Sequence, residues 1–320
     1  MSKYSTPAIF LLGPSASGKT DLSMHIAESF PVEIVSIDSA MVYQSLNIGS
    51  CKPTKAQLSK YKHHLVDIIP PNVNFSLGIF LDFLDRSILE IKSKGKIPFF
   101  VGGSMMFHNV LINGFHDFPS CKETRRKVEK KYEEEGLNKL QSELAALDEA
   151  LFKEIDIYNP RRLIRALEII HITGEKLSTL KQQPKIQLFD KNTFHLAAVN
   201  DEKTLLAERS KKRLNEILQN GLLQEIEQLI EKYDLTKQNQ SMQAINYKQF
   251  LPHLLEDVSL DDCFYDANKA TKLLIKSQQT WLKKIDIDTH LECSDTKIKD
   301  KLSATIDTYL RRHSLRRHSI

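Results

Sequence analysis

The chain has 320 residues, 41% of them hydrophobic and 27% charged, which is enough to bury one large core or two smaller ones. No apolar run approaches the roughly 18 residues of a membrane span, and the N-terminus lacks a signal-peptide pattern, so neither a membrane protein nor a secreted protein is expected. The net charge of +4 resides in the last ten residues, which hold four arginines and no acid, so a site for a polyanion must come from local clustering elsewhere.

Short apolar runs alternate with helical patterns in the first hundred residues. Ala8–Leu12, Val32–Ile37 and residues 97–101 are predicted strands, and a helix is expected to begin near Gly18. A second helical repeat lies between the last two strands and is formed by Leu77, Phe80, Leu84, Ile88 and Ile91. This alternation predicts βαβ units and a parallel sheet.

From about residue 121 the sequence pattern changes to one typical of charged helices. Asn159 and Pro160 mark the start of a helix that should end at Gly174. One more strand is predicted at 194–199, followed by helices from 202 to about 284. We therefore expect a P-loop-like α/β core with a helical C-terminal layer (1–118 and 190–312), a mobile helical insertion (119–189) and a disordered basic tail (313–320). The four cysteines form no CxxC pair, which favours a reducing, cytoplasmic setting.

A phosphate-binding loop follows the first predicted strand. The sequence GPSASGKT at 13–20 is a complete G-x-x-x-x-G-K-[ST] motif between a strand and a helix. Its backbone N–H groups would surround a di- or triphosphate, Lys19 would supply positive charge, and the Thr20 hydroxyl is suited to hold Mg²⁺. The motif comprises Gly13, Pro14, Ser15, Ala16, Ser17, Gly18, Lys19 and Thr20.

Two further candidates end the other strands. Asp38 follows the second strand and would face the phosphate site as a general base, or else cap a turn or hold a metal-bound water. Gly102, Gly103 and Ser104 follow the third strand and form either a second anion-binding nest or a tight turn. His63, His64 and Asp67 suggest a metal site, but a structural role at a strand end is the better interpretation.

Basic residues gather in three places. A charged stripe alone is usually a solvated face, but three of them beside a phosphate loop favour contact with a nucleic-acid backbone. They are Arg125, Arg126, Lys127, Lys130 and Lys131; Arg162 with Arg165 on one helix face; and Lys269, Lys272, Lys276 and Lys283.

Taken in order, these motifs resemble the bacterial tRNA dimethylallyltransferases. They are GPSASGKT, DSAMVYQ (38–44), IGSCKP (48–53), HHLVD (63–67), VGGSMMF (101–107), NPRRLIRALEI (159–169) and the Thr280–Trp281 pair. The resemblance runs from about residue 7 to about 285. It implies Mg²⁺-dependent transfer of a dimethylallyl group from dimethylallyl diphosphate to N6 of the adenosine 3′ of the anticodon. The tRNAs would be those that read U-starting codons, and the product is N6-isopentenyladenosine.

The resemblance also implies roles for individual residues. Lys19, Thr20 and Arg213 would bind the diphosphate and Mg²⁺, Asp38 would accept a proton from the adenine amine, and Ser104, where the family usually has threonine, would contact the leaving diphosphate. We expect no membrane contact and a monomer. The tRNA would contact Asp38, Ser39, Ala40, Met41, Ser104, Arg126, Arg161, Arg162, Leu163, Ile164 and Arg165.

The chain departs from the family pattern at several positions. Phe107 lacks the usual tyrosine hydroxyl, and Asn246 replaces a glycine in a turn where asparagine tolerates positive φ. Leu273 and Ser277 replace polar and basic residues late in the chain. Two alternatives therefore stay open beside prenyl transfer: a P-loop phosphotransferase or nucleotide kinase, and a tRNA-binding paralogue that has lost catalysis.

Overall fold

The computed structural model describes residues 2–317 and divides into two compact units. The core unit comprises Tyr4–Asn109 and the chain from Phe189 onward, and the helical unit comprises Val110–Leu188 with the first residues of the chain. Within the described residues, none of the helices combines the length and apolar character that crossing a bilayer requires.

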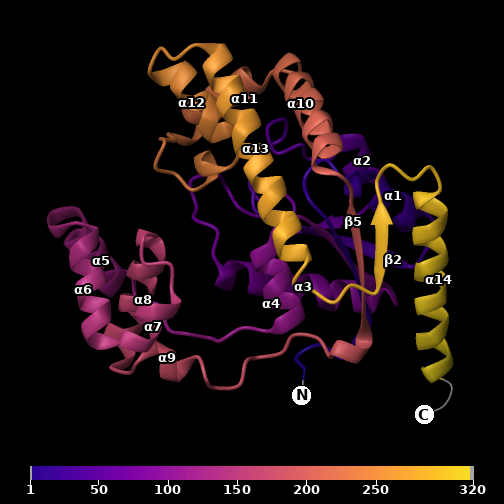
Figure 1. Ribbon diagram of the computed structural model, residues 1–320. Helices are drawn as coiled ribbons and strands as arrows, with labels where there is room; N and C mark the ends of the chain where they lie inside the picture. The colour runs from indigo at the N-terminus through magenta and orange to yellow at the C-terminus, as the bar shows by residue number, and fades with distance from the viewer. Residues whose placement is uncertain (1, 318–320) are drawn as a thin grey trace. The chain divides into compact units, whose positions relative to one another are not determined.

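The core unit contains a six-stranded parallel sheet (Figure 1). Its spatial order is β3-β2-β4-β1-β5-β6. The strands are β1 (Ala8–Leu12), β2 (Val32–Ile37), β3 (His63–His64), β4 (Ile97–Gly102), β5 (Phe194–Asn200) and β6 (Thr289–Glu292). Because β2, β4 and β1 are neighbours, the loops that follow these three strands leave the sheet at the same edge.

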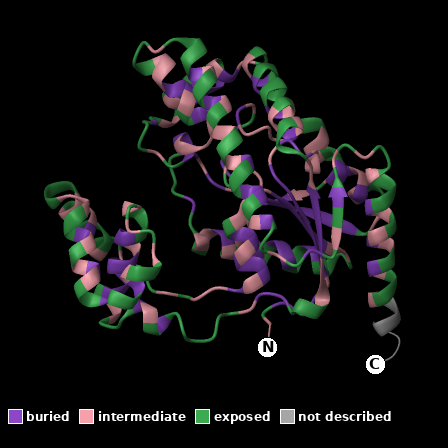
Figure 2. Cartoon of the chain, in the orientation of Figure 1, coloured by how far each residue is buried: buried purple, intermediate pink, exposed green. Residues whose placement is uncertain are grey.

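Both faces of this sheet are covered, and its central strands β1, β2 and β4 are almost wholly buried, whereas the edge strand β6 is mostly not (Figure 2). On one face Ile9 and Leu11 pack with apolar residues of α1 (Lys19–Ser29) and α14 (Ile298–Arg317). Phe10 points to the other face because side chains alternate along a strand, and its ring stacks on Phe100 at 4.7 Å. Burial on both faces explains why the strands are continuous apolar runs.

The remaining helices of the core unit occupy the connections between strands and the C-terminal layer. After β2 and β3 come α2 and α3, and after β5 the chain is helical almost without interruption as far as β6. Their bounds are α2 (Lys55–Lys60), α3 (Leu77–Ser93), α4 (Met105–Asn113), α10 (Lys203–Gln219), α11 (Leu222–Tyr233), α12 (Tyr247–Leu255) and α13 (Leu260–Leu282), with 3₁₀ turns at Lys191–Thr193 and Ser241–Gln243.

Five helices form the helical unit and share a separate apolar core. They are α5 (Lys122–Glu135), α6 (Leu137–Leu147), α7 (Glu149–Glu154), α8 (Pro160–Thr173) and α9 (Leu177–Leu180). The Asn159 side chain accepts hydrogen bonds from the first N–H groups of α8, and Gly174 ends the helix with φ 70°. These are the start and stop that the sequence predicts.

The α/β class, the parallel sheet and the helical insertion are confirmed. The short strand β6 and the helix α14 are absent from the sequence prediction, whereas β3 lies where His63 and His64 are expected to end a strand. The basic segment 313–320, expected to be disordered, lies partly in α14, which ends at Arg317, and partly in residues 318–320, outside the described residues.

Candidate active site

A cavity of about 540 Å³ in the core unit lies at the edge of the sheet where β1, β2 and β4 end. Three predicted segments line it: the loop Ser15–Thr20 after β1, Asp38–Met41 after β2, and Gly102–Ser104 after β4. Arg213 of α10 lines the same cavity. The structure therefore brings together the predicted phosphate loop, general base and hydroxyl, although Asp38 lies 18 residues after Thr20 and Ser104 lies 66 residues after Asp38.

The phosphate loop needs glycine at two places for different reasons. A Cβ on Gly13 would lie 2.4 Å from the carbonyl oxygen of Val199, so no side chain fits there. Gly18 has φ 82° at the N-terminus of α1, a left-handed conformation that glycine adopts without strain. The helix start it creates is a site for anions, because the first backbone N–H groups of a helix lack partners within it.

Lys19 folds back over its own loop. Its Nζ donates to the carbonyl oxygen of Pro14 at 2.7 Å and lies 3.4 Å from Ser17 Oγ. Burial and the nearby Arg213 guanidinium lower the pKa of Lys19 to about 8, against the opposing effect of Asp38. Lys19 and Arg213 thus concentrate positive charge in one cavity, which favours a polyanionic ligand.

Asp38 uses one carboxylate oxygen to shape its turn. Its Oδ1 accepts hydrogen bonds from the backbone N–H groups of Ala40 at 2.8 Å and Met41 at 3.2 Å. Its Oδ2 carries no hydrogen bond within the described part of the chain. The turn-capping interpretation is therefore correct for Oδ1, and the second oxygen is available to a ligand.

Ser104 is held at the entrance to α4 by its backbone. Its N–H donates to the carbonyl oxygen of Ile37 at 3.1 Å, which ties the end of β4 to the residue before Asp38. A Cβ on Gly102 would lie 2.1 Å from the same Ile37 oxygen, so only glycine permits this approach of β4 to β2. The half-buried Ser104 is thereby fixed beside the Asp38 turn.

Gln278 of α13 joins two of these loops, and no sequence argument singled it out. Its Oε1 accepts from the Ser15 N–H at 2.9 Å, and its Nε2 donates to the Gly103 carbonyl oxygen at 2.9 Å. One buried amide thus bridges the phosphate loop and the turn that carries Ser104. The sequence signal that could have identified Gln278 is its position just before the Thr280–Trp281 pair, in a segment that resembles the family.

Glu225 of α11 holds another part of the cavity wall. Its carboxylate accepts hydrogen bonds from the backbone N–H groups of residues 47, 48 and 49 at 2.8 to 3.1 Å, and from the hydroxyl of Tyr247 at 2.6 Å. Burial and this carboxylate raise the pKa of Tyr247, so the hydroxyl stays a donor. These hydrogen bonds fix the segment that includes Gly49 and Cys51, both of which line the cavity.

Two departures from the family pattern have clear structural consequences. Asn246 adopts φ 76°, as its replacement of glycine requires, and its Nδ2 donates to the Gly49 carbonyl oxygen at 2.8 Å. Phe107 is buried, with ring centroids 5.3 Å from Phe75 and 4.4 Å from Phe80. The hydroxyl that tyrosine would carry at this position is therefore missing from an aromatic cluster in the core.

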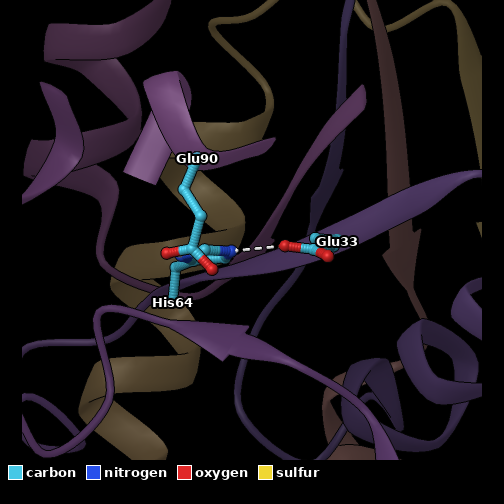
Figure 3. Close-up of side chains that lie close together, drawn as sticks. All are labelled: Glu33, His64 and Glu90. Atoms are coloured by element: carbon cyan, nitrogen blue, oxygen red, sulfur yellow. Dashed lines mark hydrogen bonds and ion pairs between the residues drawn. The ribbon is translucent and has the colours of Figure 1, made fainter. Parts of the chain in front are cut away.

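A second group of charged side chains lies near the amino ends of the strands, where Glu33 and His64 are joined by a hydrogen bond of 2.8 Å and Glu90 approaches the same ring (Figure 3). Lys94 and Lys96 both pair with Glu33 at 3.1 Å. Burial opposes ionisation of Glu33, but hydrogen bonds from His64, Lys96 and Lys94 lower its pKa to about 2. The lysines already neutralise the carboxylates, so this group is an ion-pair cluster, in keeping with the structural role predicted for His64.

Asp67 likewise has a structural partner. Its Oδ1 lies 2.6 Å from the Nζ of Lys52, which also donates to the Tyr43 carbonyl oxygen at 2.9 Å. The His63 ring is hydrogen-bonded to the Tyr61 carbonyl oxygen at 2.7 Å. These contacts secure the loop after β2 and fit the predicted strand-end role of both residues.

In the helical unit, the predicted RNA-binding residues divide into buried and exposed ones. The side chains of Leu163 and Ile164, both in the segment predicted to contact tRNA, are buried in the apolar core of this unit. Arg165 donates to the carbonyl oxygens of Phe118 and Pro119 and pairs with a buried glutamate at 2.9 Å, so it secures the chain entering the unit. Arg126, Arg161 and Arg162 are exposed.

Most basic residues of α5 are paired with carboxylates. Arg125 pairs with Glu129, Lys127 with Glu123, Lys130 with Glu134, and Lys131 with Glu143, at 2.7 to 3.5 Å. The lysines predicted on α13 differ. Lys269, Lys272, Lys276 and Lys283 are exposed and have no ion pair within the described residues, and Lys276 borders a shallow groove of about 370 Å³ with Leu273, Ser277 and Trp281.

The family of the chain follows from comparison with known proteins. Residues 41–285 match the family model described as IPP transferase, and residues 7–70 match the one described as isopentenyl transferase. The chain belongs to the IPP transferase family. This confirms the resemblance drawn from the motifs.

Relatives align with nearly the whole chain. A tRNA dimethylallyltransferase of Thiobacillus denitrificans is 34% identical over 95% of this chain and 97% of its own length, and one of Acinetobacter baumannii is 38% identical over 91% and 96%. Among solved structures, the full-length tRNA isopentenylpyrophosphate transferase of Bacillus halodurans covers 98% of this chain and all of its own, with TM-score 0.70 and 28% identity. A eukaryotic dimethylallyltransferase acting on tRNA covers 96% and 80%, with TM-score 0.82 and 26% identity.

Proposed function

We propose that this IPP transferase family member transfers the dimethylallyl group of dimethylallyl diphosphate to N6 of the adenosine 3′ of the anticodon in tRNAs that read U-starting codons. The product is N6-isopentenyladenosine in tRNA, and diphosphate is released. The observation that carries the proposal is the single cavity in which a phosphate loop, an aspartate with an unbonded oxygen and a hydroxyl meet. Relatives named for this reaction support it over nearly the whole chain.

The diphosphate end of the substrate is assigned to the loop 13–20. Its backbone N–H groups and the start of α1 would surround the phosphates, and Lys19 with Arg213 would neutralise the charge that develops as the C1–O bond breaks. Ser104 would donate a hydrogen bond to the bridging oxygen of this leaving group. The stabilisation of developing charge by preplaced donors is usually the largest contribution to catalysis.

The acceptor end of the cavity is assigned to Asp38. The exocyclic amine of adenine is a weak nucleophile, so it must be held in line with C1 of the prenyl group. Asp38 would orient the amine and accept a proton from it as the N6–C1 bond forms, and the turn Ser39–Met41 would border the base. The adenosine must leave the stack of the anticodon loop to reach this point.

The donor set at the phosphate loop suits Mg²⁺. Thr20 offers a hydroxyl oxygen and Asp38 a carboxylate oxygen in the same cavity, and hard oxygen donors are those that Mg²⁺ prefers. Thr20 would hold the ion, which when bound supplies additional positive charge to the diphosphate. Glu33, His64 and Glu90 are not assigned to it, because lysines already neutralise the two carboxylates.

The tRNA is assigned to exposed basic residues, chiefly Arg126, Arg161 and Arg162 of the helical unit. We assign the mobile insertion to residues 119–189 and expect the enzyme to act as a monomer, which sedimentation of the purified chain tests. The anticodon stem-loop is the part of the tRNA that carries the target adenosine.

Labelled dimethylallyl diphosphate tests the reaction directly. The full chain is incubated with an unmodified tRNA transcript that has adenosine 3′ of its anticodon, with Mg²⁺ or with EDTA. We expect label in the tRNA only with Mg²⁺, and N6-isopentenyladenosine after nuclease digestion. Binding of tRNA without transfer would identify a paralogue that has lost catalysis, and ATP consumption without transfer would identify a phosphotransferase.

A further inference from the structure

Tyr158 is the most exposed large hydrophobic side chain among the described residues. Its exposed fraction is 78%, whereas most other apolar side chains of the helical unit are in its core. Exposing an aromatic ring of this size to water costs free energy that burial would recover. A single exposed ring is common on protein surfaces, so the groups around it decide whether it belongs to a contact surface.

The backbone that carries Tyr158 is firmly held. The Tyr158 N–H donates to Asp156 Oδ1 at 3.2 Å, and the Asn159 N–H donates to the Asp156 carbonyl oxygen at 3.2 Å. Asn159 in turn caps α8 through the N–H groups of Arg161 and Arg162. These hydrogen bonds thus hold the backbone of Tyr158 at a fixed place, immediately before the N-terminus of α8.

The charges beside this ring are those of Arg161 and Arg162 on α8 and of Asp156, whose carboxylate accepts the Tyr158 N–H. Arg161 has no carboxylate partner within the described residues, and Arg162 meets only Asp156, at 3.8 Å. The basic residues of α5 are, by contrast, mostly neutralised by glutamates one turn away. A polyanion that approaches this part of the helical unit therefore meets two weakly compensated arginines next to an exposed aromatic ring.

We propose that Tyr158, Arg161 and Arg162 form a platform on which one unpaired nucleotide of the tRNA stacks. The phenol ring offers a flat face to a base, and the two guanidinium groups can bind the phosphates on either side of it. A double-stranded segment does not fit this chemistry, because its bases are already stacked. The inference rests on the proposed function, since it gives the tRNA substrate a specific contact.

The chain contains a matched control. Tyr265 on α13 is also exposed, at 66%, but the carboxylates within one turn of it, Asp261, Asp262 and Asp266, outnumber the one lysine there, Lys269, so its surroundings carry net negative charge that repels RNA. Substituting either tyrosine by alanine removes one exposed phenol ring. Only the loss of Tyr158 should affect the RNA.

Binding of end-labelled tRNA transcript by the full chain tests the platform. Tyr158→Ala should raise the Kd about fivefold or more, because stacking of one base is worth at least that factor. The slope of log Kd against log salt should stay unchanged, because no charge is lost. Tyr158→Phe and Tyr265→Ala should bind as the unsubstituted chain does, and Tyr158→Ala should leave binding of a fully paired RNA duplex unaltered.

Two results overturn the inference. One is equal tRNA affinity of Tyr158→Ala and Tyr265→Ala, and the other is equal weakening of tRNA and duplex binding by Tyr158→Ala. Thermal unfolding of each variant, recorded in parallel, separates a lost contact from lost structure. Failure of the unsubstituted chain to bind tRNA at all contradicts the proposed function itself, and the inference with it.

Discussion

The two carboxylate oxygens of Asp38 have different roles, one in folding and one in the proposed chemistry. Oδ1 holds the turn through the N–H groups of Ala40 and Met41, and Oδ2 is left for a ligand. Two substitutions separate these tasks. Asparagine keeps an oxygen for the turn but cannot accept a proton at neutral pH, whereas alanine loses both.

Asp38→Asn should reduce the rate of prenyl transfer by 10²-fold or more, because general bases contribute about that factor. Its thermal stability should match that of the unsubstituted enzyme, and Asp38→Ala should be less stable. Single-turnover transfer and thermal unfolding measure the two effects. Transfer by Asp38→Asn at more than half the normal rate would exclude the role as base.

The lowered pKa of Lys19 predicts that diphosphate binding depends on pH. Its pKa is lowered to about 8, so the free enzyme carries this charge below pH 8 and loses it above. Because the bound anion requires the charged form, the Kd for inorganic diphosphate should rise above pH 8, by up to tenfold per pH unit. Calorimetric titration between pH 7 and 9.5 measures it.

Lys19→Arg provides the comparison, since arginine remains charged throughout this range. Its Kd should change with pH only as far as the ionisation of diphosphate itself requires. Parallel pH profiles of the two proteins would show that Lys19 does not titrate in the free enzyme.

At the scale of secondary structure elements, α13 stabilises two loops at once through Gln278. Gln278→Ala should raise the KM for dimethylallyl diphosphate about tenfold, because the Ser15 N–H and the Gly103 carbonyl oxygen each lose a buried partner. Leu273→Ala, at an exposed position of the same helix outside the cavity lining, should leave KM unchanged. A normal KM in Gln278→Ala, measured by steady-state transfer, would mean that the loops hold their positions unaided.

The helix α11 acts on the cavity wall through Glu225. Glu225→Gln replaces an oxygen that accepts backbone N–H groups with an amide that also donates, and it should lower the free energy of unfolding by about 1–3 kcal/mol. Tyr247→Phe removes only one of these hydrogen bonds and should cost less, about 1 kcal/mol. Urea unfolding of both variants and of the double variant measures the coupling. Strictly additive losses would contradict a shared cluster.

These same elements show how far a sequence can be interpreted. The strands and the limits of α8 follow from local signals, namely apolar runs, Asn159 and Gly174. The phosphate loop, Asp38 and Ser104 are predictable as a group because neighbouring parallel strands end at one edge. Gln278 is not, because it meets Ser15 across 263 residues of chain. Within the predicted tRNA-binding segment 161–165, Leu163 is buried whereas Arg161 and Arg162 are exposed, because a helix turns successive residues to different faces.

At the scale of the whole molecule, the distribution of charge matters more than its total. The net charge of +4 says little about RNA binding, since most basic residues of α5 are neutralised by glutamates and the α13 lysines are not. Unpaired cations release the counterions of the nucleic acid on binding, whereas a paired cation must give up its carboxylate contact to gain a phosphate contact. Position and pairing together should therefore predict which residues set the salt dependence of binding.

Two double variants with the same loss of formal charge test this rule. Arg161→Ala with Arg162→Ala removes one cation without an ion pair in the described residues and one whose carboxylate partner lies 3.8 Å away, and it should weaken tRNA binding and reduce the slope of log Kd against log salt by roughly 1.5. Lys127→Ala with Lys130→Ala removes cations paired with Glu123 and Glu134, and it should change the slope by less than half as much. Filter binding of tRNA between 50 and 300 mM salt, concentrations chosen to span roughly the range over which such contacts weaken, gives both slopes. Equal slopes for the two variants would show that net charge alone governs the association, and that the arginines at the start of α8 are ordinary solvated surface.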